Sequence, residues 1–328
     1  MKKTIAIILV IQAIILGCQQ LPSNQDTSGN VPDDSLDYII PDTSLISEDA
    51  FGDAVRYGLN LMEKTAFFIG PNGSNGHYTR NLMACSNCHQ QAGTKPFSFN
   101  LMRSHQEYPQ YRPREDKILT LAERVNNCIT RPHNGRPLPY ESKEMIAFLS
   151  YLKWINSFVI RKDRFAGEKN LQIQYPDIAA NAKTGSVLYA QHCERCHQKN
   201  GEGLFNDDTT AYLYPPLWGD LSYRKGSSMN RVTKMAGWLK ANMPHQLASH
   251  TNPVLSDVEA LHIAAFINDE SIHSRPGDAT YDYPNPLTKP MDYDKGPYAD
   301  PFSEEQHKNG PFPPIIKYWE EKGQKLVK

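Results

Sequence analysis

Two short cysteine–histidine motifs carry the clearest chemistry in this chain of 328 residues. Each motif has the form C-x-x-C-H, in which the two thiols can form thioethers to a haem and the histidine can ligate its iron. The motifs consist of Cys85, Cys88 and His89, and of Cys193, Cys196 and His197. They account for four of the six cysteines, and they predict two covalently attached c-type haems with iron at their centres.

The first of the two remaining cysteines, Cys18, ends a hydrophobic leader. Residues 4–16 form an apolar run that is too short to span a bilayer comfortably and is typical of a signal peptide. The run ends in Ile-Leu-Gly-Cys, which looks like a bacterial lipobox. We expect a lipoprotein signal peptide over 1–17, lipidation of Cys18 and a membrane-anchored protein of the periplasm. Ordinary signal cleavage nearby, with Cys18 incidental, is the alternative.

Composition and charge exclude several classes of protein. The formal net charge is −1, so the chain as a whole does not resemble a nucleic-acid binder. It contains 20 Gly and 24 Pro, which indicates a loop-rich structure. Cytochrome c domains have this character, because the haem supplies much of the core and short helices surround it.

Apolar residues at helical spacing surround each haem motif and predict the same plan twice. An entry helix precedes the first motif, with Phe51, Val55, Leu59 and Met62 in a segment started by Ser47. A closing helix follows it, with Met145, Ile146, Leu149, Leu152 and Ile155 behind a candidate cap at Ser142. The entry segment of the second motif contains Val187, Leu188 and Tyr189. Its closing helix begins at a capping box over 256–259 and continues through Leu261, Ala265 and Phe266.

The predicted fold class is therefore all-α, with two tandem cytochrome c domains, loop-rich connections and an extended C-terminal tail. Each domain is expected to wrap round one covalent haem. We expect the segments 1–17 (signal peptide), 18–40 (flexible tether), 41–165 (domain 1), 166–183 (linker), 184–276 (domain 2) and 277–328 (Pro/Tyr-rich tail).

The sixth ligand of each iron sets its potential and reactivity. For the second haem the favoured candidate is Met243, which follows a helical segment and is itself followed by Pro. A thioether ligand raises the potential, which suits an electron exit. Met235, which falls on the apolar face of that helix, is the main rival. Weaker rivals are His245 and Lys240.

For the first haem, Cys128 lies between the motif and the closing helix, as Met243 does in the second unit. Its distance from His89 is 39 residues, against 46 between His197 and Met243. A thiolate there would make a His/Cys haem. Met102 and His105 are further possibilities, and a buried free cysteine acting as a small hydrophobe is the structural alternative.

Six arginines cluster between residues 103 and 136, on either side of this cysteine. Arginine binds oxyanions through a planar fork of donors, and nearby cations favour a cysteine thiolate. Interspersed acidic residues make a solvated surface the alternative. Beside a spare cysteine and a haem, the cluster indicates a site for an anionic substrate.

Over roughly residues 45–275 the chain resembles the dihaem thiosulfate dehydrogenases. The most specific part is Glu-Arg-Val-Asn-Asn-Cys over 123–128, continuing to Asn-Gly at 134–135 and Leu-Pro at 138–139. The resemblance implies that Cys128 is the catalytic ligand of the active-site haem and that Arg114 and Arg124 bind substrate. It also implies Met243 as a ligand of the electron-transfer haem. Some members have Lys before that Met and exchange ligands on reduction; Asn242 here argues for stable His/Met ligation.

The family's reaction joins two thiosulfates into tetrathionate and releases two electrons. The resemblance implies that Cys128 bonds transiently to one thiosulfate, and that electrons pass through the second haem to a partner cytochrome or other redox protein. Some members work well in reverse, as tetrathionate reductases. Three other classes remain as alternatives: a dihaem electron carrier without a substrate, a dihaem peroxidase, and a subunit like the related SoxA-type cytochromes.

Overall fold

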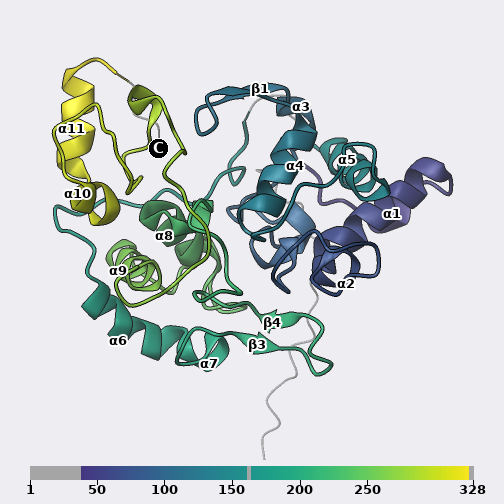
Figure 1. Ribbon diagram of the computed structural model, residues 1–328, viewed down its shortest axis with the longest axis horizontal. Helices are drawn as coiled ribbons and strands as arrows, with labels where there is room; N and C mark the ends of the chain where they lie inside the picture. Colours follow the sequence, from purple (N-terminus) through teal and green to yellow (C-terminus); the bar gives the residue numbers. More distant parts are fainter. Residues whose placement is uncertain (1–37, 161–163, 325–328) are drawn as a thin grey trace, which may run out of the picture. The chain divides into compact units, whose positions relative to one another are not determined.

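Helices form nearly all of the regular structure in the computed structural model, which describes residues 38–160 and 164–324. Within these ranges there are eleven α-helices and two small antiparallel hairpins (Figure 1). The hairpins pair β1 (Gln110–Arg112) with β2 (Lys117–Leu119), and β3 (Leu204–Phe205) with β4 (Tyr212–Tyr214). The all-α prediction is confirmed.

The first motif lies among five helices, two of which cross closely. These are α1 (Ala50–Glu63), α2 (Thr65–Ile69), α3 (Ser104–Glu107), α4 (Leu121–Thr130) and α5 (Lys143–Asn156). The expected entry and closing helices are α1 and α5, which lie side by side. Ser142 caps α5 as predicted, by accepting a hydrogen bond from the backbone of Met145. The cap of α1 is Asp49 instead of Ser47, whose hydroxyl donates to the Asp49 carboxylate.

The second motif lies among α6 (Ala182–His192), α7 (Glu194–His197), α8 (Val232–Asn242) and α9 (Asp257–Ile267). Here α6 packs on α9, and α9 packs on α8. The predicted capping box is present: Ser256 accepts from the backbone of Glu259, and the Glu259 carboxylate accepts from the backbone of Ser256. The entry-and-closing arrangement thus occurs twice.

A glycine sits at each of the two crossings. A side chain at Gly58 of α1 would clash with the carbonyl oxygen of Ala147 in α5, and one at Gly185 of α6 would clash with that of His262 in α9. Neither glycine has a positive φ, so close backbone approach is the reason for glycine at both positions.

Two hydrophobic cores match this division. The first runs from Tyr38 to Phe165 and is dominated by buried residues of α1 and α5. The second runs from Ile173 to Trp319 and is built mainly on α8 and α9. The two cores agree with the two-domain fold, whereas the exact boundaries given above stay predictions.

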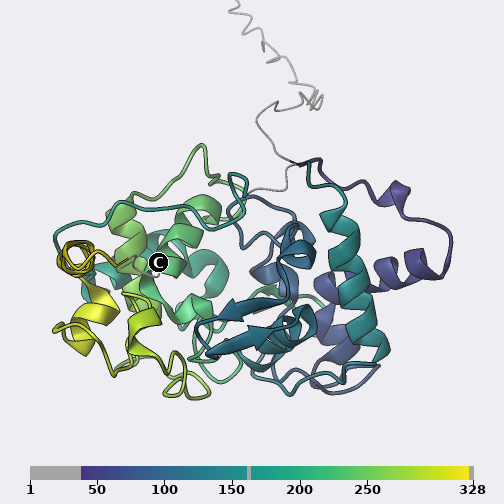
Figure 2. The same ribbon diagram turned by 90° about the horizontal axis from the view of Figure 1, so that it is seen from above.

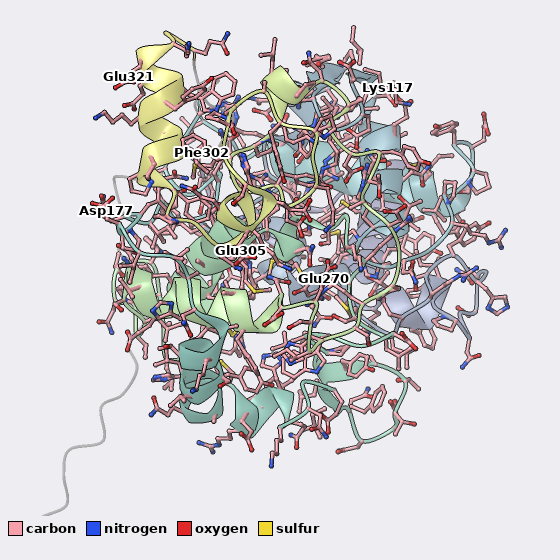
Figure 3. The ribbon with its side chains drawn as sticks, turned by 60° about the vertical axis from the view of Figure 1, so that its left-hand side comes forward. Lys117, Asp177, Glu270, Phe302, Glu305 and Glu321 are labelled. Carbon is pink, nitrogen blue, oxygen red and sulfur yellow. The ribbon has the colours of Figure 1, made fainter. Side chains whose placement is uncertain are left out.

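The tail contains two helices that the sequence pattern did not predict. They are α10 (Glu304–Asn309), capped by Ser303, and α11 (Pro313–Glu321), which begins with two prolines. Both are too short for a clear period. Phe312, Ile315 and Trp319 belong to the second core, so the tail completes that core. Figure 2 shows this yellow segment beside the green helices, and Figure 3 labels Phe302, Glu305 and Glu321 along it.

Among residues 38–160 and 164–324, no helix is both long and apolar enough to cross a membrane. The expected signal peptide, the lipid site at Cys18 and most of the tether lie outside the described residues.

Candidate functional site

Cys128 lies on α4, one helical turn after Arg124. A capping box fixes the start of this helix: the Thr120 hydroxyl accepts from the backbone of Glu123, and the Glu123 carboxylate accepts from the backbone of Thr120. Residues four apart share a helix face, so the cap places Arg124 and Cys128 together. Sequence reasoning gave the spacing of this pair but did not predict the helix.

Neighbouring groups favour the thiolate form of Cys128. Arg124 Nη1 lies 3.0 Å from Cys128 Sγ. Burial raises the pKa of the thiol, but the Arg124 charge and a hydrogen bond from His89 outweigh burial and hold the pKa at about 6. A buried cysteine acting only as a small hydrophobe would lack these partners.

His89 approaches the same sulfur with a defined tautomer. Its Nδ1–H donates to the backbone carbonyl of Phe99 at 2.6 Å, so Nε2 is the ring nitrogen that is turned to the sulfur and would bind a metal in place of its proton. This arrangement is the usual one for a metal-bound histidine. His89 and Cys128 are therefore the two side chains that would hold a haem iron at this motif, the imidazole through Nε2 and the cysteine through its sulfur.

The two motif cysteines lie beside this pair, free and partly buried. Thr65 Oγ1 donates to Cys85 Sγ at 3.3 Å. Burial raises the pKa of Cys85 and of Cys88 to about 12, with the Cys128 charge as a smaller contribution for each. His133, which sequence reasoning missed, is also buried here, with Nε2 3.8 Å from Cys85 Sγ. These thiols fit thioether attachment of a haem between His89 and Cys128.

The second motif repeats the histidine geometry. His197 Nδ1–H donates to the backbone carbonyl of Pro215 at 2.8 Å, so its Nε2 is likewise left as a donor to iron. Burial raises the pKa of Cys193 to about 12, and Cys196 is free and partly buried. These residues fit a second covalent haem.

The methionine candidates have different surroundings. Met243 is the C-cap residue of α8 and is half-buried against the second core. Met235 is completely buried in that core, where its sulfur accepts a hydrogen bond from Asn268 Nδ2 at 3.4 Å. Lys240 forms an ion pair with Asp257 at 2.6 Å, and His245 is exposed.

The other candidates for the sixth ligand of the first haem also have different surroundings. Met102 is completely buried within the first core, and His105 is exposed on α3.

Arg114 lies close enough to Arg124 for their charges to interact. Its guanidinium donates from Nη1 to the carbonyl of Gly226 and lies against Tyr283. Burial lowers the pKa of Arg114, but Tyr283 and Asp282 outweigh burial and raise it above its usual range.

Tyr108, Asp282 and Tyr283 were not singled out from the sequence. Tyr108 is half-buried close to Arg124, and burial raises its pKa against the effect of that arginine. Asp282 and Tyr283 are more than 150 residues from Arg114, so no local pattern could have connected them.

Comparison with known proteins assigns both motifs to cytochrome families. Residues 75–156 match the family described as SoxA/TsdA, cytochrome c domain, and residues 180–267 match cytochrome C oxidase, cbb3-type, subunit III. A thiosulfate dehydrogenase of Psychrobacter arcticus is 33% identical, over 69% of this chain and 66% of its own. A thiosulfate dehydrogenase of Stutzerimonas stutzeri is 31% identical, over 69% of this chain and 70% of its own.

The chain belongs to the thiosulfate dehydrogenase family. A solved thiosulfate dehydrogenase (TsdBA) from Marichromatium purpuratum shares the fold, with a TM-score of 0.65 and 30% identity, over 73% of this chain and 49% of that one. This chain thus spans about two thirds of the curated relatives and half of the solved protein. Like its family, it is a dihaem cytochrome with two covalently bound haems c.

Proposed function

We propose that the chain oxidises two thiosulfates to tetrathionate at the site of Cys128 and passes the two electrons to an external acceptor. The observation that carries this proposal is the Arg124–Cys128–His89 arrangement: a low-pKa sulfur faces the histidine of the first C-x-x-C-H motif and has an arginine 3.0 Å away. A plain electron carrier needs neither a nucleophilic sulfur nor a part-buried arginine beside it.

In the proposed reaction, Cys128 thiolate forms an S–S bond to the sulfane sulfur of one thiosulfate, which gives a cysteinyl thiosulfonate and releases two electrons. The second thiosulfate attacks that sulfane sulfur, forms the central bond of tetrathionate and returns Cys128 as thiolate. The two haems, when bound, can each take up one electron. Arg114 and Arg124 offset the charge of the two dianions, whose repulsion opposes their approach.

We propose Met243 as the second axial ligand of the iron held by His197. Support comes from its place at the end of α8 and from the engagement of Met235 with Asn268. We also propose a periplasmic lipoprotein anchored through Cys18, with a cytochrome or other redox protein as electron partner. The reverse reaction, reduction of tetrathionate, uses the same groups and remains part of the proposal.

The test is thiosulfate-dependent reduction of ferricyanide by the purified, haem-loaded protein, with tetrathionate quantified. We expect Cys128→Gly to retain both haems and lose turnover, because the sulfur that carries the intermediate is gone. Arg136→Gln is the matched control: this arginine belongs to the same cluster but stacks on Tyr78 at the surface, and the variant should keep full activity. A Cys128→Gly enzyme of unchanged rate contradicts the proposal.

A low-spin EPR signal typical of thiolate ligation is expected from the first haem of the wild type and should be absent from Cys128→Gly. Its absence from the wild type would favour a simple electron carrier instead.

A further inference from the structure

The tail holds one of the two arginines proposed to bind substrate. The backbone N–H of Tyr283 donates to the carbonyl of Arg114 at 2.9 Å, and Arg114 Nε donates to the Tyr283 hydroxyl at 3.4 Å. The guanidinium carbon lies 5.3 Å from the centre of the Tyr283 ring. Both the backbone and the side chain of Arg114 are thus fixed by one tail residue.

Asp282, the preceding tail residue, places a carboxylate among the arginines. Its oxygens lie 3.2 Å from Arg131 Nη2 and 3.8 Å from Arg114 Nε, and one accepts a hydrogen bond from the Tyr293 hydroxyl at 2.9 Å. The Arg114 and Asp282 side chains are only 11% and 14% exposed, so solvent screens their interaction poorly. A dianion that binds Arg114 must compete with this carboxylate.

The tail is itself anchored to the second half of the molecule. Asp292 is completely enclosed and pairs with Arg231 and Thr233. Tyr283 has a φ of +57°, a left-handed conformation that is unfavourable for a tyrosine. Such a conformation persists where surrounding contacts over-determine it, and the contacts here are those with Arg114 and Tyr293.

We propose that Tyr283 is a positioning residue for Arg114 and that Asp282 sets the affinity of the site for dianions; this inference rests on the proposed function. Tyr283 keeps the guanidinium in one orientation before substrate arrives, which lowers the cost of ordering it on binding. Asp282 partly neutralises Arg114 and Arg131, which weakens the binding of thiosulfate and tetrathionate alike and thereby speeds product release. Residues 282 and 283 lie beyond the matched regions 75–156 and 180–267, so this control is a feature of the tail.

The experiment compares the dissociation constant of thiosulfate with steady-state KM and kcat in four variants of the full holoprotein. Binding is measured by calorimetry on the fully reduced, anaerobic protein, whose haems cannot accept electrons, so binding is read without turnover. We expect Asp282→Asn to bind thiosulfate about tenfold more tightly, because a poorly screened negative charge is removed. We expect Tyr283→Ala to bind about tenfold more weakly, because Arg114 loses its ring contact and hydrogen bond.

Two further variants separate the positioning of Arg114 from a general loss of structure in the tail. Tyr283→Phe keeps the ring and should stay within about twofold of the wild type, since it loses only a long hydrogen bond. Tyr281→Phe, two residues earlier and 88% exposed, is the matched control and should not change binding. A misfolded tail weakens thiosulfate binding in both Asp282→Asn and Tyr283→Ala. The inference instead requires tighter binding in Asp282→Asn and weaker binding in Tyr283→Ala.

The outcomes distinguish this inference from the function it rests on. A wild type without thiosulfate turnover overturns the proposed function. A different result overturns the role of the tail alone. In that case the wild type turns over thiosulfate, but Asp282→Asn binds thiosulfate no more tightly than the wild type, or Tyr283→Ala binds it equally well.

Discussion

At the scale of single residues, the chemistry depends on which charges surround one sulfur. Arg124 lies 3.0 Å from Cys128 Sγ, and the opposing effects of burial and of this cation leave the pKa of the thiol at about 6. A planar guanidinium can contact the sulfur and still present donors to an oxyanion, whereas an ammonium group has no such fork. Arg124 is therefore suited both to hold the thiolate and to receive substrate.

We expect Arg124→Lys to raise the KM for thiosulfate about tenfold, because a point charge on a flexible stem cannot reproduce the fork of donors. Steady-state kinetics with ferricyanide as acceptor measure the change. Arg136→Lys is the control, since Arg136 is exposed and contacts Tyr78. If Arg124→Lys keeps the wild-type KM, Arg124 acts on the sulfur only and another group binds the anion.

At the scale of elements, each haem motif is placed by a pair of crossed helices with a glycine at the crossing. Gly58 lets α1 approach α5, and Gly185 lets α6 approach α9, in each case against a backbone carbonyl that cannot rotate away. Helix α6 runs directly into Cys193, and the Ser86 hydroxyl of the first motif donates to the Met62 carbonyl near the end of α1 at 3.0 Å, so each entry helix ends beside its motif.

Alanine at either crossing should destabilise the holoprotein by about 1–3 kcal/mol, because the helices must separate to admit a methyl group. Thermal unfolding measures the loss, with Gly58→Ala and Gly185→Ala compared separately. Gly296→Ala is the matched control, since a Cβ there meets only ordinary contacts with Tyr298, and its φ is not positive. Unchanged unfolding temperatures in both crossing variants would show that the crossings can adjust.

At the scale of the whole molecule, the sequence predicted several local features and missed the contacts that join distant segments. The haem motifs, the Ser142 cap and the capping box at Ser256 are contained within a few residues, and each was found. The contact of Arg114 with Tyr283 spans 169 residues and rests on tertiary packing, so no periodicity reveals it. Helix α11 was missed for the same reason, since its residues Ile315 and Trp319 belong to the second core.

Helix α8 contacts the loop that follows the first haem motif, residues 88–99. Trp238 Nε1 donates to the carbonyl of Cys88 at 3.1 Å, and Asn242 Nδ2 donates to the carbonyl of Phe97 at 3.0 Å. The same loop supplies the Phe99 carbonyl that orients His89. Helix α8, which is followed by Met243, therefore also supports the loop that orients His89 of the first motif.

Asn242→Ala should affect both halves of the molecule, because it leaves the Phe97 carbonyl without its donor and loosens the loop that orients His89. An unsatisfied buried carbonyl costs about 1–3 kcal/mol, so the unfolding temperature of the holoprotein should fall by a few degrees. The EPR signal of the first haem should broaden or shift as well, since the orientation of an axial imidazole influences that signal. Asn252→Ala, at an exposed position, is the control. A lower unfolding temperature with an unchanged EPR signal would limit Asn242 to a structural role. The environment of the first haem would then not depend on α8, the helix that precedes the proposed ligand of the second haem.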